Sequence, residues 1–224
     1  MQQKTIELVQ NLVTVGTIAI GVASLYFAFP GPNIAWLLLG FVILGTAYDF
    51  CSHVIGRIAG KPAPSLEIYA RFNFAALCFG IPFTSLAATF VIAEVAPGGI
   101  NSQIAMFWPQ VLIGSLLFGG LFLFARYKTF ELHGAVEYTL DKSHGFTRTI
   151  FLVRRVLLAV SVILTLVVMY EGFTTNLGWW TFSYSILFIA TVPLHILHRP
   201  VASMVAEAAT LLVLFYGTYR VFEI

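Results

Sequence analysis

The sequence has few charged residues for its length. Of 224 residues, 12 are Lys or Arg and 10 are Asp or Glu, so charged residues make up only 10% of the chain. A soluble domain carries about 25% charged residues. This chain therefore cannot cover itself with a surface suited to water. The net charge of +2 without a basic run gives no indication of nucleic acid, and we expect no nucleic-acid partner.

Cysteine and the common catalytic motifs are also scarce. The two cysteines, Cys51 and Cys78, do not form a CxxC pair, which excludes a zinc knuckle. No phosphate-binding loop, dinucleotide fingerprint, nucleophile elbow or Ser-His-Asp arrangement is visible. Because these motifs are missing, we assign no catalytic residue. Active transport by this chain would have to be coupled to an ion or driven by a partner.

Long apolar runs dominate what the chain does contain. Apolar residues make up 59% of the sequence and the mean hydropathy is +0.90. One membrane crossing needs about 20 apolar residues, and its backbone must be helical because lipid offers no hydrogen-bond partners. The sequence therefore predicts an all-α, polytopic membrane helical bundle that forms one integral domain over residues 1–224. The seven predicted transmembrane helices cover 10–29, 34–56, 68–94, 103–126, 149–170, 178–197 and 201–222.

The placement of Lys and Arg sets the predicted orientation. Basic residues concentrate on the cytoplasmic side of membrane proteins. With the N-terminus inside and the C-terminus outside, only Arg220 of the twelve basic residues lies outside. This N-in/C-out pattern is typical of a bacterial-type inner (plasma) membrane protein, and the lipid bilayer is the first expected partner. The inside residues are Lys4, Arg57, Lys61, Arg71, Arg126, Lys128, Lys142, Arg148, Arg154, Arg155 and Arg199.

A weak repeat marks the predicted outer turns. Each turn carries an asparagine that is followed within a few residues by a tryptophan, which fits three helical hairpins plus one final helix. The alternative is that any such turn favours Gly, Pro or Asn, and that Trp settles at the membrane interface. The pairs are Asn33 with Trp36, Asn101 with Trp108, and Asn176 with Trp179.

The connection 127–148 is the only sizeable polar segment, and we expect it in the cytoplasm. Leu132, Val136 and Leu140 recur at intervals of four residues, which predicts a short amphipathic helix on the membrane surface. Such a helix would also suit the docking of a protein partner.

Polar residues gather at the predicted cytoplasmic end of the bundle. Asp49 comes about seven residues before the second run ends, or roughly 10 Å inside it, and Glu207 reaches a similar depth. Arg71, Arg154 and His195 belong to the same layer. A buried carboxylate costs about 2.5 kcal/mol or more in the membrane and usually faces the bundle interior or an aqueous cavity. We therefore predict a substrate or ion pathway along these five residues. The alternatives are arginines that reach the headgroups, or structural ion pairs.

Two classes of function remain open. The first, which we favour, is a small-solute or ion transporter, or the membrane-embedded subunit of a transport or electron-transfer complex, with a protein partner or a second copy. The second is a metal-dependent membrane enzyme or haem protein with its site at the cytoplasmic end. His53, His195 and His198 are its candidate metal ligands, with Asp49 sharing the helix face of His53. The cofactor is otherwise unassigned.

Overall fold

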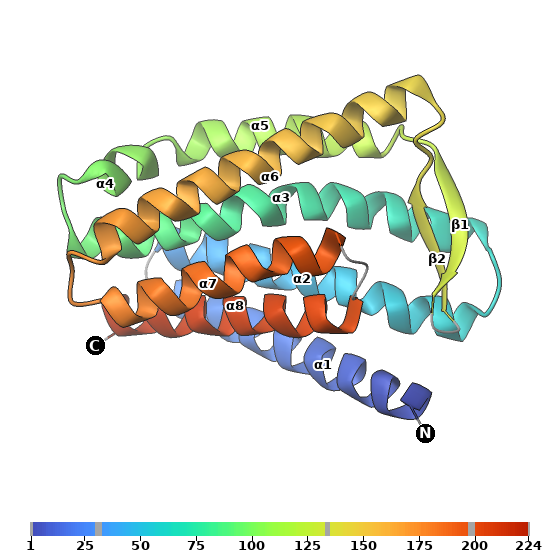
Figure 1. Ribbon diagram of the computed structural model, residues 1–224, viewed down its shortest axis with the longest axis horizontal. Helices are drawn as coiled ribbons and strands as arrows, with labels where there is room; N and C mark the ends of the chain where they lie inside the picture. The colour runs from blue at the N-terminus through green and yellow to red at the C-terminus, as the bar shows by residue number, and fades with distance from the viewer. Residues whose placement is uncertain (1, 30–32, 133–134, 197–199, 224) are drawn as a thin grey trace.

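A computed structural model describes residues 2–29, 33–132, 135–196 and 200–223, although the side chains of 2–3, 77–81, 132, 192, 195–196 and 200 are not part of that description. The described chain is mostly helical, with one two-stranded hairpin (Figure 1). The helices are α1 (Gln2–Ala28), α2 (Ile34–Ala59), α3 (Pro64–Val95), α4 (Ile100–Ala105), α5 (Trp108–Phe122), α6 (Gly145–Gly172), α7 (Gly178–Ile196) and α8 (Pro200–Phe222). The strands are β1 (Tyr127–Leu132) and β2 (Ala135–Leu140).

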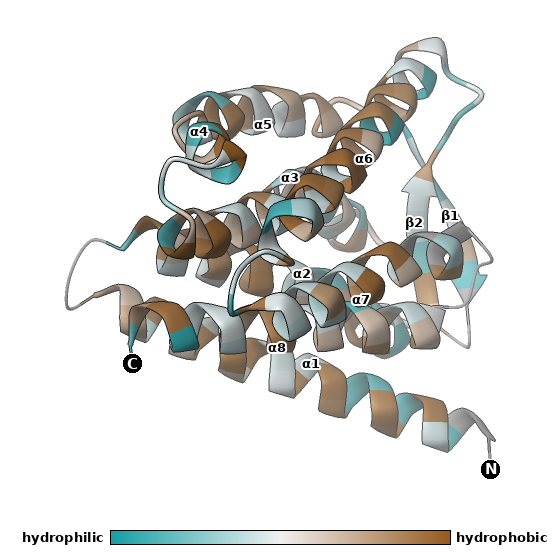
Figure 2. Ribbon diagram, turned by 60° about the vertical axis from the view of Figure 1, so that its left-hand side comes forward, coloured by the Kyte–Doolittle hydropathy of each residue, from teal (hydrophilic) through white to brown (hydrophobic). Residues whose placement is uncertain are grey.

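Most of each predicted apolar run is helical in the described residues. Within the described residues, four helices are long and apolar enough to cross a membrane, and they mark the chain as an integral membrane protein. These four are Lys4–Ala28, Ile34–Ala59, Gly145–Gly172 and Val201–Phe222. Figure 2 shows apolar residues spread along the helices of the bundle.

The run 103–126 is not one helix. It contains the end of α4 and the whole of α5, with Met106 and Phe107 between them. Pro109 stands in the first turn of α5, where its missing N–H leaves no helical bond unmade, so the sequence starts a new helix there. The 15 residues of α5 extend about 22 Å, which is less than the ~30 Å core of a bilayer.

The two ends of the bundle differ in the elements they carry. The N-terminus lies at the same end as the β-hairpin, and the C-terminus lies at the opposite end (Figure 1). Strand β2 packs against both α2 and α3. The hairpin therefore covers one end of the helix pair α2–α3.

Helix α1 buries its polar face and exposes its apolar face. Gln10 and Thr14 are 3% and 5% exposed, whereas Leu12 and Val15 are 64% and 66% exposed. A helix in water shows the reverse pattern. The buried stripe of small and polar residues packs on α2, and the exposed aliphatic face suits contact with lipid tails.

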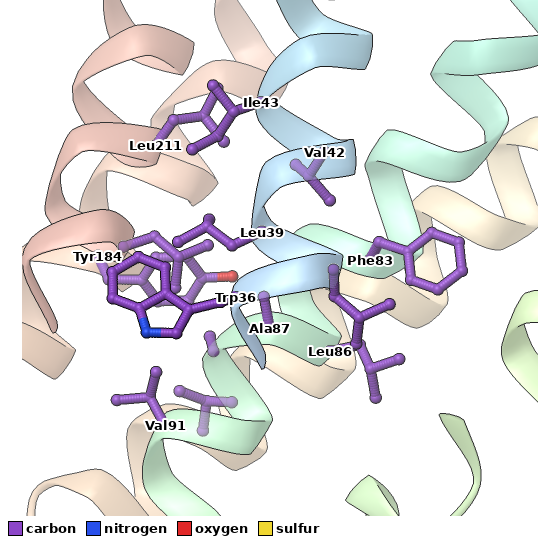
Figure 3. Packing of buried hydrophobic residues seen from close by; sticks show 14 of the residues in the cluster. Trp36, Leu39, Val42, Ile43, Phe83, Leu86, Ala87, Val91, Tyr184 and Leu211 are labelled. Carbon is purple, nitrogen blue, oxygen red and sulfur yellow. The ribbon is translucent and has the colours of Figure 1, made fainter. Parts of the chain in front are cut away.

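The main core lies between α2, α3, α7 and α8 (Figure 3). Trp36, Leu39 and Ile43 occupy one face of α2 at helical spacing, and all three side chains are fully buried. Leu86 and Val91 of α3 belong to the same cluster of buried residues. The interior is therefore closed by close-packed apolar side chains over most of its length.

A second contact joins α7 to α8. On α7, Trp180 and Tyr184 stack with ring centroids 5.7 Å apart. The Trp180 Nε1–H donates to the backbone carbonyl of Val213 on α8 at 2.6 Å. Gly217, one turn further along α8, leaves room for the indole, because a Cβ at this position would overlap Trp180. The glycine thus sets the distance between the two helices.

The asparagines of the predicted outer turns have different local roles. The side chain of Asn33 caps α2 by accepting from the backbone N–H groups of Ala35 and Trp36. Asn101 lies inside α4 and binds the carboxylate of Glu171, which also accepts the Asn101 backbone N–H. Asn176 is exposed in a turn. The three positions therefore share no local structure, although α1 packs on α2, α3 on α5, and α6 on α7.

The amphipathic helix predicted within 127–148 is wrong. Residues 127–132 and 135–140 form an antiparallel hairpin with Tyr127 opposite Leu140 and Leu132 opposite Ala135. Val136 and Leu140, four residues apart on β2, fit the two-residue period of a strand as well as the helical period, whereas Leu132 belongs to β1. Strand-forming residues then favour the hairpin: Tyr127, Thr129, Phe130, Val136, Tyr138 and Thr139.

We predict that Gly217→Ala destabilises the protein. Overpacking against Trp180 costs about 1–3 kcal/mol, which lowers the Tm by roughly 3–10 °C. Thermal unfolding of the purified protein in detergent measures the change. Gly16→Ala is the matched control, since a Cβ there meets nothing within 4 Å. Equal Tm values for the two variants would contradict the close α7–α8 contact.

Candidate functional site

A row of polar side chains follows one face of α2. Asp49, His53 and Arg57 stand at i, i+4 and i+8, so they lie one above the other along the helix. Each of the three contacts a different neighbouring element. The row therefore joins α2 to α3, to the hairpin and to α1.

Asp49 contacts α3. The Asn73 Nδ2–H donates to Asp49 Oδ1 at 2.5 Å, and Asn73 is only 5% exposed. The other amide atom, Asn73 Oδ1, is buried and accepts no hydrogen bond from the described residues. Leaving a buried acceptor unpaired costs about 1–3 kcal/mol, so this position favours an added donor.

His53 contacts the hairpin. Its Nδ1 pairs with Oε1 of Glu137 on β2, and the two side chains are only 11% and 12% exposed. Gly56, one turn along α2, allows this approach, since a Cβ there would overlap the backbone carbonyl of Val136. The hydroxyl of Tyr138 adds a second anchor by donating to the carbonyl of Ala63 at 3.2 Å. The hairpin is therefore held against α2 through His53 and Gly56, and against Ala63, the residue before α3, through Tyr138.

Arg57 contacts α1. Its Nη2–H donates to Gln10 Oε1 at 2.6 Å, and its Nη1 lies 3.6 Å from the carboxylate of Glu7. The buried Gln10 thus receives a charged donor at the end of the polar stripe of α1. This contact lies outside the cavity described next.

A cavity of about 570 Å³ opens beside this row, between α2, α3, α6, α7, α8 and the hairpin. We call it the hairpin-end cavity. Its described walls are mostly apolar and aromatic, with a few polar groups, as in pockets that bind small molecules. The charged or ionisable groups among its described lining residues, phenols apart, are Asp49, His53, Glu137, Arg154 and Glu207.

Glu207 and Arg154 approach the cavity from α8 and α6. The hydroxyl of Ser203 donates to Glu207 Oε1 at 3.1 Å, one turn away on the same helix. The Arg154 guanidinium lies over the ring of Phe74 on α3, with 5.6 Å between its central carbon and the ring centroid. Asp49, Arg154 and His53 line the same cavity as Glu207. Four elements thus bring charge to one space.

The structure brings together some of the residues predicted for the pathway. Asp49, Glu207 and Arg154 line the same cavity. Arg71 is not among its described lining residues: its guanidinium donates to Glu67 at 2.6 Å and to the backbone carbonyls of Leu123 and Ala125 at 2.5 and 2.9 Å. These carbonyls follow the end of α5, so Arg71 caps that helix. The side chain of His195, although its backbone belongs to α7, lies outside the described residues.

The predicted metal ligands are only partly described. Among the residues that the structure describes, no group of three or more His, Cys, Asp and Glu side chains could hold a metal ion. His53 directs its Nδ1 to Glu137, whereas the His195 side chain and the whole of His198 lie outside the description. The metal site therefore stays a prediction.

Two members of the site were not anticipated. Asn73 lies in the predicted third run, two residues from Arg71, and a polar amide in an apolar helix was the available signal. Glu137 was assigned to a surface helix. Only the hairpin, with its register, carries it to His53.

No known protein family matches the chain, and no curated protein matches it.

We predict that Gly56→Ala loosens the hairpin. The new Cβ meets the Val136 carbonyl, so β2 must move away from α2 and weaken the His53–Glu137 pair. Hydrogen exchange of the 135–140 amides should become at least about tenfold faster, the equivalent of 1.4 kcal/mol. Gly114→Ala on α5 gains the same helical propensity but meets nothing within 4 Å. Unchanged exchange in Gly56→Ala would show that the hairpin does not depend on this contact.

Proposed function

We propose that the protein carries a small solute across the membrane and binds it in the hairpin-end cavity. One observation carries the proposal: Asp49, His53, Arg154 and Glu207, together with the hairpin residue Glu137 that pairs with His53, line one cavity. These residues come from α2, α6, α8 and β2. Charged groups are expensive inside a membrane and mark solute or ion pathways when they share a cavity. The mostly apolar wall with few polar groups suits a small molecule.

The proposal includes seven membrane crossings with the N-terminus in the cytoplasm of a plasma membrane. The supporting observations are the eleven basic residues assigned to that side and the positions of the termini at opposite ends of the bundle (Figure 1). The crossings would be α1, α2, α3, α4 with α5, α6, α7 and α8. The cavity and its hairpin would then face the cytoplasm.

Terminal reporter fusions test this topology. A fluorescent protein fused at the N-terminus and alkaline phosphatase fused at the C-terminus should both be active, since the first folds in the cytoplasm and the second outside it. Exchanging the two reporters should silence both. Reporters that place both ends in one compartment would contradict an odd number of crossings.

Passage through the bundle requires the core beyond the cavity to open. Trp36, Leu39 and Tyr184 are fully buried there and close the route toward the C-terminal end. In the described conformation, the cavity is therefore a binding site near one membrane face rather than a continuous channel. The structure suits a carrier whose helices rearrange around a bound solute.

We predict that Asp49→Asn and Glu207→Gln impair transport. Each change removes a carboxylate from the cavity while keeping the shape of the side chain. The loss of a charge-assisted contact, about 1.5–3 kcal/mol, lowers uptake roughly 10- to 100-fold. Uptake into proteoliposomes of a panel of amines, amino acids, sugars and carboxylates measures the effect.

Glu94→Gln is the control for this experiment, because Glu94 is an exposed carboxylate outside the described cavity lining. Membrane insertion and elution as a single species should be the same for all variants. Variants that insert normally and keep full uptake would show that Asp49 and Glu207 have a structural role instead.

A further inference from the structure

The hairpin-end cavity has an excess of acidic groups. Its described lining contains three carboxyl groups, those of Asp49, Glu137 and Glu207, against the single guanidinium of Arg154. Carboxylate groups that line a cavity attract cations and repel anions.

Asp49 and Asn73 supply directional recognition within this field. The Asp49 carboxylate is bound by the neutral amide of Asn73, which leaves its charge uncompensated by that contact. The buried Asn73 Oδ1 accepts no hydrogen bond among the described groups. Both are acceptors and Asp49 is a carboxylate, so a partner that reaches both needs hydrogen-bond donors and is favoured by a positive charge. An ammonium group meets both requirements.

The walls of the cavity favour a cation that carries an apolar organic group. The cavity is lined by aromatic rings on α2, α3 and the hairpin: Phe50, Tyr69, Phe74, Phe130 and Tyr138. Aromatic faces attract cations and also provide apolar contact for carbon chains or rings. A volume of about 570 Å³ exceeds what a bare inorganic ion fills, and metal ions need several convergent oxygen ligands.

We propose that the solute of the hairpin-end cavity is a small organic cation, an amine with an apolar body. Its ammonium group lies beside the hydrogen-bonded pair Asp49 and Asn73, near Glu207, and its apolar part contacts the aromatic wall. This inference rests on the proposed function and specifies the substrate class of the same site.

Matched ligands test the charge requirement directly. Phenethylamine, phenethyl alcohol, phenylacetate and phenylalanine share one apolar body and differ in charge. Titration calorimetry in nanodiscs at neutral pH should show phenethylamine binding at least about tenfold more tightly than the other three. Asp49→Asn should abolish this preference, and Glu94→Gln should keep it.

Glu207→Gln provides a second test if Asp49→Asn does not fold, and it should weaken phenethylamine binding in the same direction. Equal or tighter binding of the alcohol or of phenylacetate, or failure of phenethylamine to bind at millimolar concentration, would overturn the inference. Tighter binding of phenylalanine would also overturn it, since Arg154 would then recognise a carboxylate.

The uptake panel separates this inference from the proposed function. If the protein takes up a sugar or a carboxylate, and this uptake depends on Asp49 or Glu207, the transport proposal stands and the proposal of an amine substrate is refuted. If the protein binds phenethylamine in this cavity but transports no solute, the amine-binding site stands and the transport proposal is refuted.

Discussion

The polar row on α2 is the constraint on which this end of the structure depends. Three residues at helical spacing each bind a different element: Asp49 binds α3, His53 binds β2 and Arg57 binds α1. In a bundle whose other contacts are largely apolar, such bonds fix both depth and rotation of the helices. Gly56 completes the arrangement, because only a hydrogen atom fits between α2 and the hairpin backbone. A change in the rotation of α2 would move all three contacts together.

The same row explains why a polar cavity exists in an apolar protein. Bundle interiors in lipid are held by close packing, small residues and internal hydrogen bonds, as in the contacts of α1 with α2 and of Trp180 with α8. At the hairpin end the helices carry carboxylates, an amide and a guanidinium instead. These groups cannot pack as closely as aliphatic side chains, and they are sheltered by a hairpin rather than by another helix. The result is a partly open space that is lined by carboxyl groups as well as by apolar and aromatic side chains.

The sequence predicts the class of protein and the layer of polar residues at one end of the bundle. It does not predict which residues these polar side chains contact. Long apolar runs are sufficient for the membrane-type helical bundle, and a spacing of four residues is sufficient to place Asp49 and His53 on one face. Their partners depend on tertiary packing: Asn73 reaches Asp49 through the pairing of α2 with α3, and Glu137 reaches His53 through the strand register. The hairpin itself was missed because apolar residues four apart fit both periods. Arg71 binds the carbonyls of Leu123 and Ala125, a contact that depth along a helix does not predict, because depth does not determine which face a residue occupies.

Access to the cavity tests the central claim, that a hydrated polar site opens at the hairpin end of a membrane protein. Ser52 lines the cavity and is partly exposed, so Ser52→Cys in a background lacking Cys51 and Cys78 provides a reporter. A small charged methanethiosulfonate should label it from the cytoplasmic side of oriented vesicles, while Ser24→Cys, at a fully buried position of α1, should stay unlabelled. Labelling of Ser52→Cys only from the opposite side, or not at all in the folded protein, would contradict the account.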